Sequence, residues 1–167
     1  VGMLLAIAGG VSGMIGTFLG GWLGDRYGAK DKRWYLWVPA IGGLLSQPIS
    51  MVYYLTDNTT IAIAFQFMST VCFSTFLGPC LAISHTLVHP AMRAFTSAVL
   101  FFVLNLIGLG LGPLSTGLIS DALQADYGIN SLRYAMVLVS IIGLMAPVLF
   151  YVGSRYLLDD LKRGDWK

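Results

Sequence analysis

The sequence contains no glutamate, and its charged residues are few. All eight acidic residues are aspartates, and charged residues of both signs make up only 11% of the chain. A typical soluble domain carries about twice that share of charge. The net charge of +2 also provides no strongly basic surface of the kind that nucleic acid requires, so we expect no nucleic-acid partner.

The sequence patterns that carry catalytic chemistry are also missing. There is no Walker motif, no HExxH or GxSxG sequence and no Ser-His-Asp arrangement, so the sequence predicts neither an enzyme nor an ATP-driven pump and indicates no cofactor. Cys72 and Cys80 are eight positions apart on one predicted helix. That spacing corresponds to a rise of about 12 Å, which is too long for a disulfide. We interpret both cysteines as small packing residues.

Two histidines have a spacing that metal sites use. His85 and His89 fall on one helical face, but no Cys, Asp or Glu accompanies them in the same segment. We interpret them as interfacial residues at a helix end and predict no metal site. A membrane enzyme built around this pair is the most distant of the alternatives.

Five long stretches without a formal charge dominate the chain. Each is long enough to cross a hydrocarbon core of about 30 Å as a helix, in which the backbone satisfies its own hydrogen bonds. The sequence therefore predicts an all-α, polytopic membrane protein surrounded by membrane lipid. The five predicted spans are residues 1–24, 34–56, 61–84, 94–120 and 134–154.

The cations are distributed unevenly between these spans. If the chain crosses the membrane five times, residues 25–33, 85–93 and 155–167 share one side and hold nine of the ten lysines and arginines. By the positive-inside rule this side is the cytoplasm, so we expect a cytoplasmic C-terminus. The first span lacks a basic flank and a cleavage site, which favours a permanent span over a signal peptide. Because Val1 would then lie outside without an initiating Met, we expect the chain to be the C-terminal piece of a longer polypeptide.

The strongest local motif, GWLGDRYGAK, comes at the end of the first span. It resembles the cytoplasmic loop signature of the major facilitator superfamily, GxxxD(R/K)xGR(K/R), which in that family occurs between helices 2 and 3 and recurs in a less strict form between helices 8 and 9. Ala29 replaces the expected Arg, as in the less strict copy. The residues that match the motif are Gly21, Asp25, Arg26, Gly28 and Lys30.

The residue types in this motif also have physical explanations that do not depend on the resemblance. Gly21 lets another helix approach closely, and Gly28 can adopt the positive φ of a turn after the helix ends. Asp25 lies at the C-terminal end of its helix, where the helix dipole disfavours a negative charge. We therefore expect an external partner, either a neighbouring helix N-terminus or a loop arginine, and a gating role. The alternative is that Asp25 and Arg26 only mark the water boundary.

The resemblance to the superfamily extends along the whole chain. It implies that the spans are helices 8 to 12, within the C-terminal six-helix half of the fold, and the phrases at residues 105–113, 117–121 and 131–135 are similar to bacterial members of the spinster-like branch. The resemblance further implies secondary transport of a small organic substrate by alternating access, together with the missing N-terminal half, in the bacterial inner membrane. The alternative is a non-transporting scaffold or assembly subunit that oligomerises through glycine ridges.

The third span is the most polar of the five. In the superfamily, helix 10 lines the central cavity, which implies that this span contributes to the substrate site. On a helical wheel one face gathers Gln66, Ser69, Thr70 and Phe73, which suits an amphipathic or aromatic substrate. Gln66 is the strongest candidate, because an amide facing lipid is costly, whereas a hydroxyl can instead bond a carbonyl of its own helix. No titratable group lies at depth, so we expect any coupling residue to lie outside this chain.

Small residues mark the first and fourth spans as helix-packing surfaces. They permit close backbone approach, and the family template assigns both spans to the interface between the two halves, although packing within this half is the open alternative. Asn105, an intramembrane amide, is expected to bond a neighbouring helix. The candidate packing residues are Gly9, Gly13, Gly16, Gly20, Asn105, Gly108, Gly112 and Pro113.

Overall fold

A computed structural model describes residues 2–163 of the chain, and within that range it contains helices and short connections but no strand. The elements are α1 (Gly2–Gly28), α2 (Trp34–Leu55), α3 (Thr59–Ser74), α4 (Leu77–Thr86), η1 (Pro90–Met92), α5 (Arg93–Leu104), η2 (Asn105–Leu111), α6 (Gly112–Tyr127), η3 (Gly128–Asn130), α7 (Ser131–Gly143) and α8 (Met145–Arg163).

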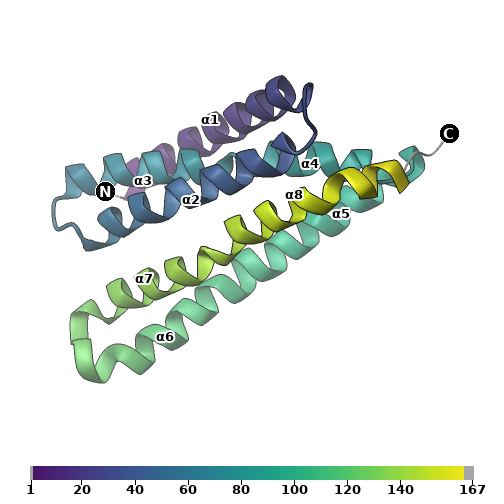
Figure 1. The fold of residues 1–167 in the computed structure, drawn as a ribbon. Coiled ribbons are helices and arrows are strands. Elements are labelled where there is room, and N and C mark those ends of the chain that lie inside the picture. Colours follow the sequence, from purple (N-terminus) through teal and green to yellow (C-terminus); the bar gives the residue numbers. More distant parts are fainter. Residues whose placement is uncertain (1, 164–167) are drawn as a thin grey trace.

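These elements join into five rods, namely α1, α2, α3 with α4, α5 with α6, and α7 with α8 (Figure 1). Over the part of the chain that the structure describes, each rod covers one of the five charge-free stretches almost completely, and α1, α6 and α8 continue beyond it into charged residues. Three continuous helical stretches there are long and apolar enough to cross a membrane, namely Ala6–Gly28, Thr59–Thr86 and Pro90–Asp159. The third stretch contains two antiparallel rods (Figure 1). The chain is therefore an all-α membrane protein, and the crossing by five separate spans remains a prediction.

The ends of the rods follow from local sequence. Asn58 caps the start of α3, because its side-chain oxygen accepts the backbone N–H groups of Thr60 and Ile61. Gly128 ends α6 with a positive φ of 52°, a conformation that other residues rarely adopt. Near the same end of the bundle, the ion pair between Arg133 and Asp57 ties the start of α7 to the α2–α3 connection.

The rods pack in two groups. α1, α2 and the α3–α4 rod pack against one another, while the α5–α6 and α7–α8 rods run antiparallel and pack together through α6 and α7 (Figure 1). α8 runs along α2 and connects the two groups. Contact between the α3–α4 rod and the α5–α6 rod is confined mainly to α4 and α5. Space therefore remains between α3 and α6.

Glycines on α1 and α2 allow α3 to pack closely. A Cβ atom built on Gly16 would overlap the main-chain carbonyl of Val71 on α3, and one built on Gly20 would overlap that of Thr75, the residue directly after α3. A Cβ atom built on Gly42 of α2 would overlap the Thr75 hydroxyl. Such contacts place helix backbones closer together than any larger residue permits. In this structure Gly16 and Gly20 therefore pack within the group of α1, α2 and α3.

Candidate functional site

The space between α3 and α6 contains a cavity of about 770 Å³, walled by α2, α3, α6 and α7. We call it the polar cavity, because more than half of its lining residues carry a hydroxyl or an amide and none carries a charge. Its polar lining residues are Ser46, Gln47, Ser50, Tyr53, Tyr54, Ser69, Thr70, Thr116 and Ser140.

Three of the four residues predicted to form a substrate cavity line the polar cavity: Ser69, Thr70 and Phe73. The Ser69 hydroxyl donates across helices to the carbonyl of Ser46, at 3.2 Å. The Thr70 hydroxyl donates to the Gln66 carbonyl of its own helix, at 2.9 Å. Both hydroxyl oxygens can still accept a hydrogen bond from a bound molecule.

Gln66 lies elsewhere. It is not among the residues that line the polar cavity, and a Cβ atom built on Gly9 of α1 would lie 4.0 Å from its Nε2. Its Oε1 is buried without a hydrogen-bond partner within residues 2–163. The structure thus separates Gln66 from the three residues with which it shares a helical face.

A residue that sequence reasoning missed occupies a central place in the lining. Gln47 lines the polar cavity and also a second cavity of about 400 Å³, which we call the inner apolar cavity. The two cavities share Gln47, Phe73 and Gly143, so they adjoin. The available signal was the one used for Gln66, an amide inside a charge-free span.

The inner apolar cavity is walled almost entirely by hydrocarbon and aromatic groups. Phe73 and Phe76 contribute rings from the α3–α4 rod, and their ring centroids are 5.4 Å apart. Ile107 and Gly108 of η2 and Phe150 of α8 add further apolar surface. Together the two cavities present neutral polar groups beside an apolar wall.

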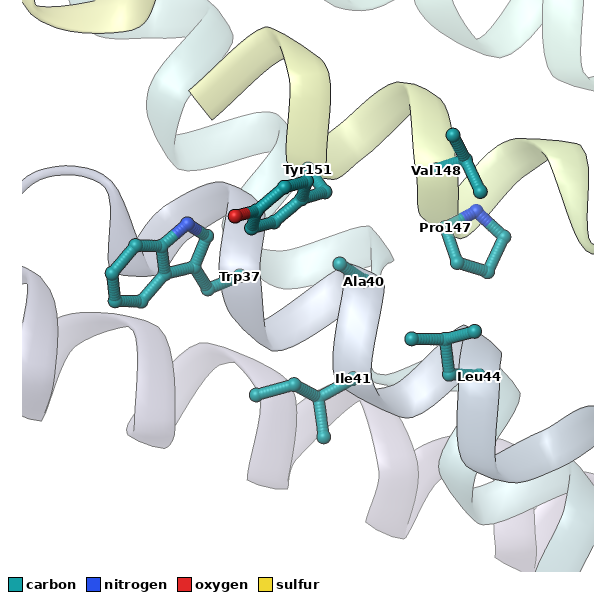
Figure 2. Close-up of a pocket in the computed structure, with 7 residues that line it drawn as sticks. All are labelled: Trp37, Ala40, Ile41, Leu44, Pro147, Val148 and Tyr151. Atoms are coloured by element: carbon teal, nitrogen blue, oxygen red, sulfur yellow. The ribbon is translucent and has the colours of Figure 1, made fainter. Parts of the chain in front are cut away.

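A third pocket, of about 420 Å³, lies between α2 and α8 (Figure 2). Figure 2 shows the ring of Tyr151 above the same stretch of α2 that carries Trp37 and Ala40, with Pro147 and Val148 nearer the start of α8. The lining is apolar or aromatic, which suits a hydrocarbon chain rather than a polar solute. We therefore place the candidate site at the polar cavity and not here.

The motif residues at the end of α1 form a compact aromatic cluster with α2. Tyr35 donates its hydroxyl to Asp25 Oδ1 at 3.0 Å, and its ring occupies the space beside Gly28 that a Cβ atom would fill. The Arg26 guanidinium lies over the Trp22 ring, 5.1 Å from its centroid. Asp25 thus has a partner on the first turn of α2, although it is a tyrosine and not the expected helix N-terminus or arginine.

The rest of the motif is consistent with close packing at this corner. A Cβ atom built on Gly78 of α4 would lie 3.0 Å from Gly21 Cα, so α4 approaches α1 closely at Gly21. The Lys30 backbone N–H donates to the Tyr27 carbonyl at 3.1 Å and closes the turn after α1. Gly28 is still part of α1 and does not have the positive φ expected of it. The Tyr27 and Trp34 rings then stack across that turn, with centroids 4.7 Å apart.

The small residues of the fourth span lie in or next to an irregular helix segment. η2 is a π-helix, and a Cβ atom built on Gly108 would have no side chain or neighbouring helix of the described residues within 4 Å. Asn105 Nδ2 donates to the Phe101 carbonyl of its own helix at 2.7 Å, in place of the expected bond to a neighbouring helix. Gly112 has only the Ile107 carbonyl nearby, at 3.8 Å, and Pro113 lines the polar cavity.

The glycines at the start of α1 face α3 more loosely. A Cβ atom on Gly13 would lie 3.9 Å from the Ser74 hydroxyl, an ordinary contact.

The two histidines each lie within hydrogen-bond distance of a group in the neighbouring segment. His85 Nε2 lies 2.6 Å from Ser97 Oγ, and His89 Nδ1 accepts the Ala91 N–H at 3.3 Å. Among the described residues no three His, Cys, Asp or Glu side chains gather as metal ligands would.

Comparison with known proteins identifies relatives along nearly the whole chain, although no family model matches it. The chain is 30% identical over 166 residues to an MFS-type efflux pump of Mycolicibacterium smegmatis, a match covering 98% of this chain and 38% of that protein. It is 26% identical over 165 residues to Protein spinster homolog 3 of Danio rerio, covering 93% of this chain and 33% of the relative. The chain therefore spans less than two fifths of the length of these relatives.

Solved structures agree with the sequence relatives. A bacterial homologue of the human lysosomal transporter Spinster, crystallised in an inward-facing and unoccupied conformation, superposes with a TM-score of 0.78 at 26% identity, over 89% of this chain and 38% of that one. The inward-facing, occupied form gives a TM-score of 0.74 at 25% identity, over 89% and 40%. With the Asp25–Arg26 motif and the all-helical fold, these matches show that the chain is similar over nearly its whole length to part of transporters of the major facilitator superfamily, spinster proteins among them.

Proposed function

We propose that the protein is a secondary transporter that moves a small organic solute by alternating access, and that this chain supplies part of the wall of the solute pathway. The observation that carries the proposal is the polar cavity, an uncharged lining of hydroxyls and amides inside an otherwise apolar bundle. Polar side chains are costly in a membrane protein unless they serve packing or a pathway. The relatives named as an efflux pump and as transporters support the same reading.

The lining also suggests what kind of solute would bind. No charged residue lines the polar cavity, so an ion would find no counter-charge on this wall. Ser69 and Thr70 offer hydroxyls, and Phe73 and Tyr54 offer rings. This combination favours an uncharged or weakly charged organic molecule with aromatic or hydrocarbon parts. A coupling ion would need a titratable group from outside this cavity.

The arrangement in the membrane follows the charge distribution. We propose five spans that correspond to helices 8 to 12, with the C-terminus in the cytoplasm of a bacterial inner membrane. The protein's N-terminal half would pack on faces that are open in this structure, such as the one around Gly108 on η2. The corner formed by Asp25 and Tyr35 would then gate the cytoplasmic side.

Transport by the protein expressed from its complete reading frame tests this function. Cells that lack their own efflux pumps should accumulate less of the uncharged aromatic dye N-phenyl-1-naphthylamine when they express the protein. The double variant Ser69→Ala, Thr70→Val should reduce this effect, because it removes two hydroxyls from the polar cavity. Ser115→Ala is the matched control, since Ser115 is exposed on α6 and bonds the Gly112 carbonyl of its own helix.

One result would overturn the proposal. If the protein is present in the membrane and accumulation is unchanged for this dye and for a panel of uncharged and charged aromatic solutes, the protein does not move such solutes. The scaffold alternative would then gain support.

A further inference from the structure

We propose that Gln47 is the residue that selects solutes at this site, and that it pairs with an uncharged hydrogen-bonding group joined to an apolar body. The proposal rests on the proposed function, because it assigns a role within the same cavity. Its basis is position: Gln47 lies where the polar cavity and the inner apolar cavity adjoin, together with Phe73 and Gly143.

The Gln47 amide is available to a ligand. Within the part of the chain that the structure describes, its side chain makes no hydrogen bond, whereas the Ser46 and Ser50 hydroxyls beside it donate to the carbonyls of Gly43 and Gln47 at 2.9 and 2.7 Å. An amide carries two donor hydrogens and an acceptor oxygen, and those of Gln47 are not among the buried unpaired atoms of the described residues, so a molecule in the cavities can reach them. A molecule bound at the junction would satisfy them.

Gly143 provides the space that the amide occupies. A Cβ atom built on Gly143 would lie 2.9 Å from Gln47 Nε2 and 3.6 Å from its Cδ, so any larger residue would push the amide away. α7 ends at Gly143 and α8 begins at Met145, which places this glycine at the break between the two helices. The neighbouring Gly43 meets Pro147 in a similar way, with a Cβ atom 2.7 Å from Pro147 Cγ. α2 and the α7–α8 break therefore fix the amide between the cavities.

The chemistry on the two sides defines the ligand class. Neither cavity is lined by a charged residue. On one side Ser50 and Ser140 can bond polar atoms, and on the other Phe76 and Phe150 offer only apolar contact. A molecule that fits both has a hydroxyl, amide or ester group directly attached to a hydrocarbon or aromatic body. A carboxylate or ammonium at the junction would be desolvated without a counter-charge.

Photolabelling of the intact protein in lipid nanodiscs tests the assignment. The probes are a diazirine derivative of octanol and the matching diazirine derivative of octane, which lacks the hydroxyl. Labelling of peptides that contain Phe73 and Met136, both lining residues, is measured by mass spectrometry with and without excess octanol. Gln47→Leu should lower the octanol-competed labelling by the alcohol probe about three- to tenfold, the value of one neutral hydrogen bond. Labelling by the alkane probe should not fall.

Further variants separate the amide from the shape of the cavity. Gln47→Met keeps the length of the side chain and serves if Gln47→Leu folds poorly, and Gly143→Ala should weaken alcohol labelling by displacing the amide. Gln124→Leu is the matched control, because Gln124 is exposed near the end of α6 and lines neither cavity. Unchanged alcohol labelling in both Gln47 variants would overturn the proposal, as would an equal loss with both probes.

Transport measured on the same preparations distinguishes a failure of this proposal from a failure of the proposed function. Alcohol labelling that depends on Gln47, in a protein that moves no solute, would uphold the site and remove the transporter. Dye transport combined with labelling that is independent of Gln47 would uphold the transporter and remove this role for Gln47.

Discussion

Trp37 donates its indole N–H to the Ser154 hydroxyl, with 2.9 Å between Nε1 and Oγ. The bond joins α2 to α8 across 117 positions of sequence, and Ser154 is only 2% exposed. Ser154 in turn donates to the Tyr151 carbonyl at 2.6 Å, so one hydroxyl serves both helices. The same two helices form the apolar pocket of Figure 2, where Trp37 and Tyr151 are both lining residues. Polar and apolar contacts therefore act together at the junction between the two groups of rods.

Removal of this hydroxyl should loosen the junction. Ser154→Ala leaves the Trp37 N–H without its acceptor, and we expect a loss of about 0.6 to 2 kcal/mol in stability. Thermal unfolding of the purified protein in detergent measures the change. Ser12→Ala is the control: Ser12 is fully buried, but its hydroxyl bonds only the Gly9 carbonyl of its own helix, at 3.0 Å. Equal shifts for both variants would show that the cross-helix bond contributes nothing specific.

Close packing of α1 on α3 predicts a strong dependence on side-chain size. Gly20→Ala would place a methyl group against the Thr75 carbonyl, a main-chain atom that cannot move aside without moving α3. Overpacking of this kind costs about 1 to 3 kcal/mol. Gly10→Ala is the matched control on the same helix, because a Cβ atom there meets nothing within 4 Å. We expect a lowered melting temperature for the first variant and an unchanged or slightly raised one for the second, and the reverse order would contradict this packing.

The pair Asp25 and Tyr35 can be tested by a double-mutant cycle. If their hydrogen bond holds this corner, which we propose to be cytoplasmic, in one state, Asp25→Asn and Tyr35→Phe should each lower transport while expression persists. We expect a coupling between the two changes of about 0.5 to 1.5 kcal/mol in the equilibrium between open and closed states. Accessibility of a cysteine placed in the cytoplasmic cavity measures that equilibrium. Strictly additive effects would leave Asp25 as a residue that marks the water boundary.

Much of the fold was accessible from the sequence because charge is excluded from long helices in lipid. Each of the five charge-free stretches falls almost wholly within one rod for that reason, although α1, α6 and α8 extend past it. The wheel also placed Ser69, Thr70 and Phe73 on one face, and that face lines the polar cavity. A wheel describes only one helix, however, and the surroundings of a side chain also depend on which neighbour covers it at each height.

That dependence explains why the surroundings of Gln66 and Gln47 could not be predicted from the sequence. Gln66 shares the face of Ser69 and Thr70, but at its height the contact is with Gly9 of α1. Gln47 is a single amide in an apolar helix, and its importance follows from the space at Gly143, nearly 100 positions away along the chain. Neither relationship leaves a local pattern in the sequence. Long-range packing between rods decides both.

Replacement of Gln66 decides between its two possible roles. The Gln66 Oε1 is buried without a hydrogen-bond partner among the described residues, and an unpaired buried polar group costs about 1 to 3 kcal/mol. If Gln66 only packs against α1, Gln66→Leu should leave solute binding unchanged and keep or raise the melting temperature, because leucine removes the unpaired oxygen and fills much of the same volume. If Gln66 instead belongs to the substrate cavity, the same variant should lower solute affinity. Binding and thermal unfolding measured on one purified sample of the intact protein separate these outcomes, and on the contacts with Gly9 we expect the first. A clear loss of affinity without loss of stability would return Gln66 to the cavity wall and show that the surroundings of α3 change when the whole transporter is assembled.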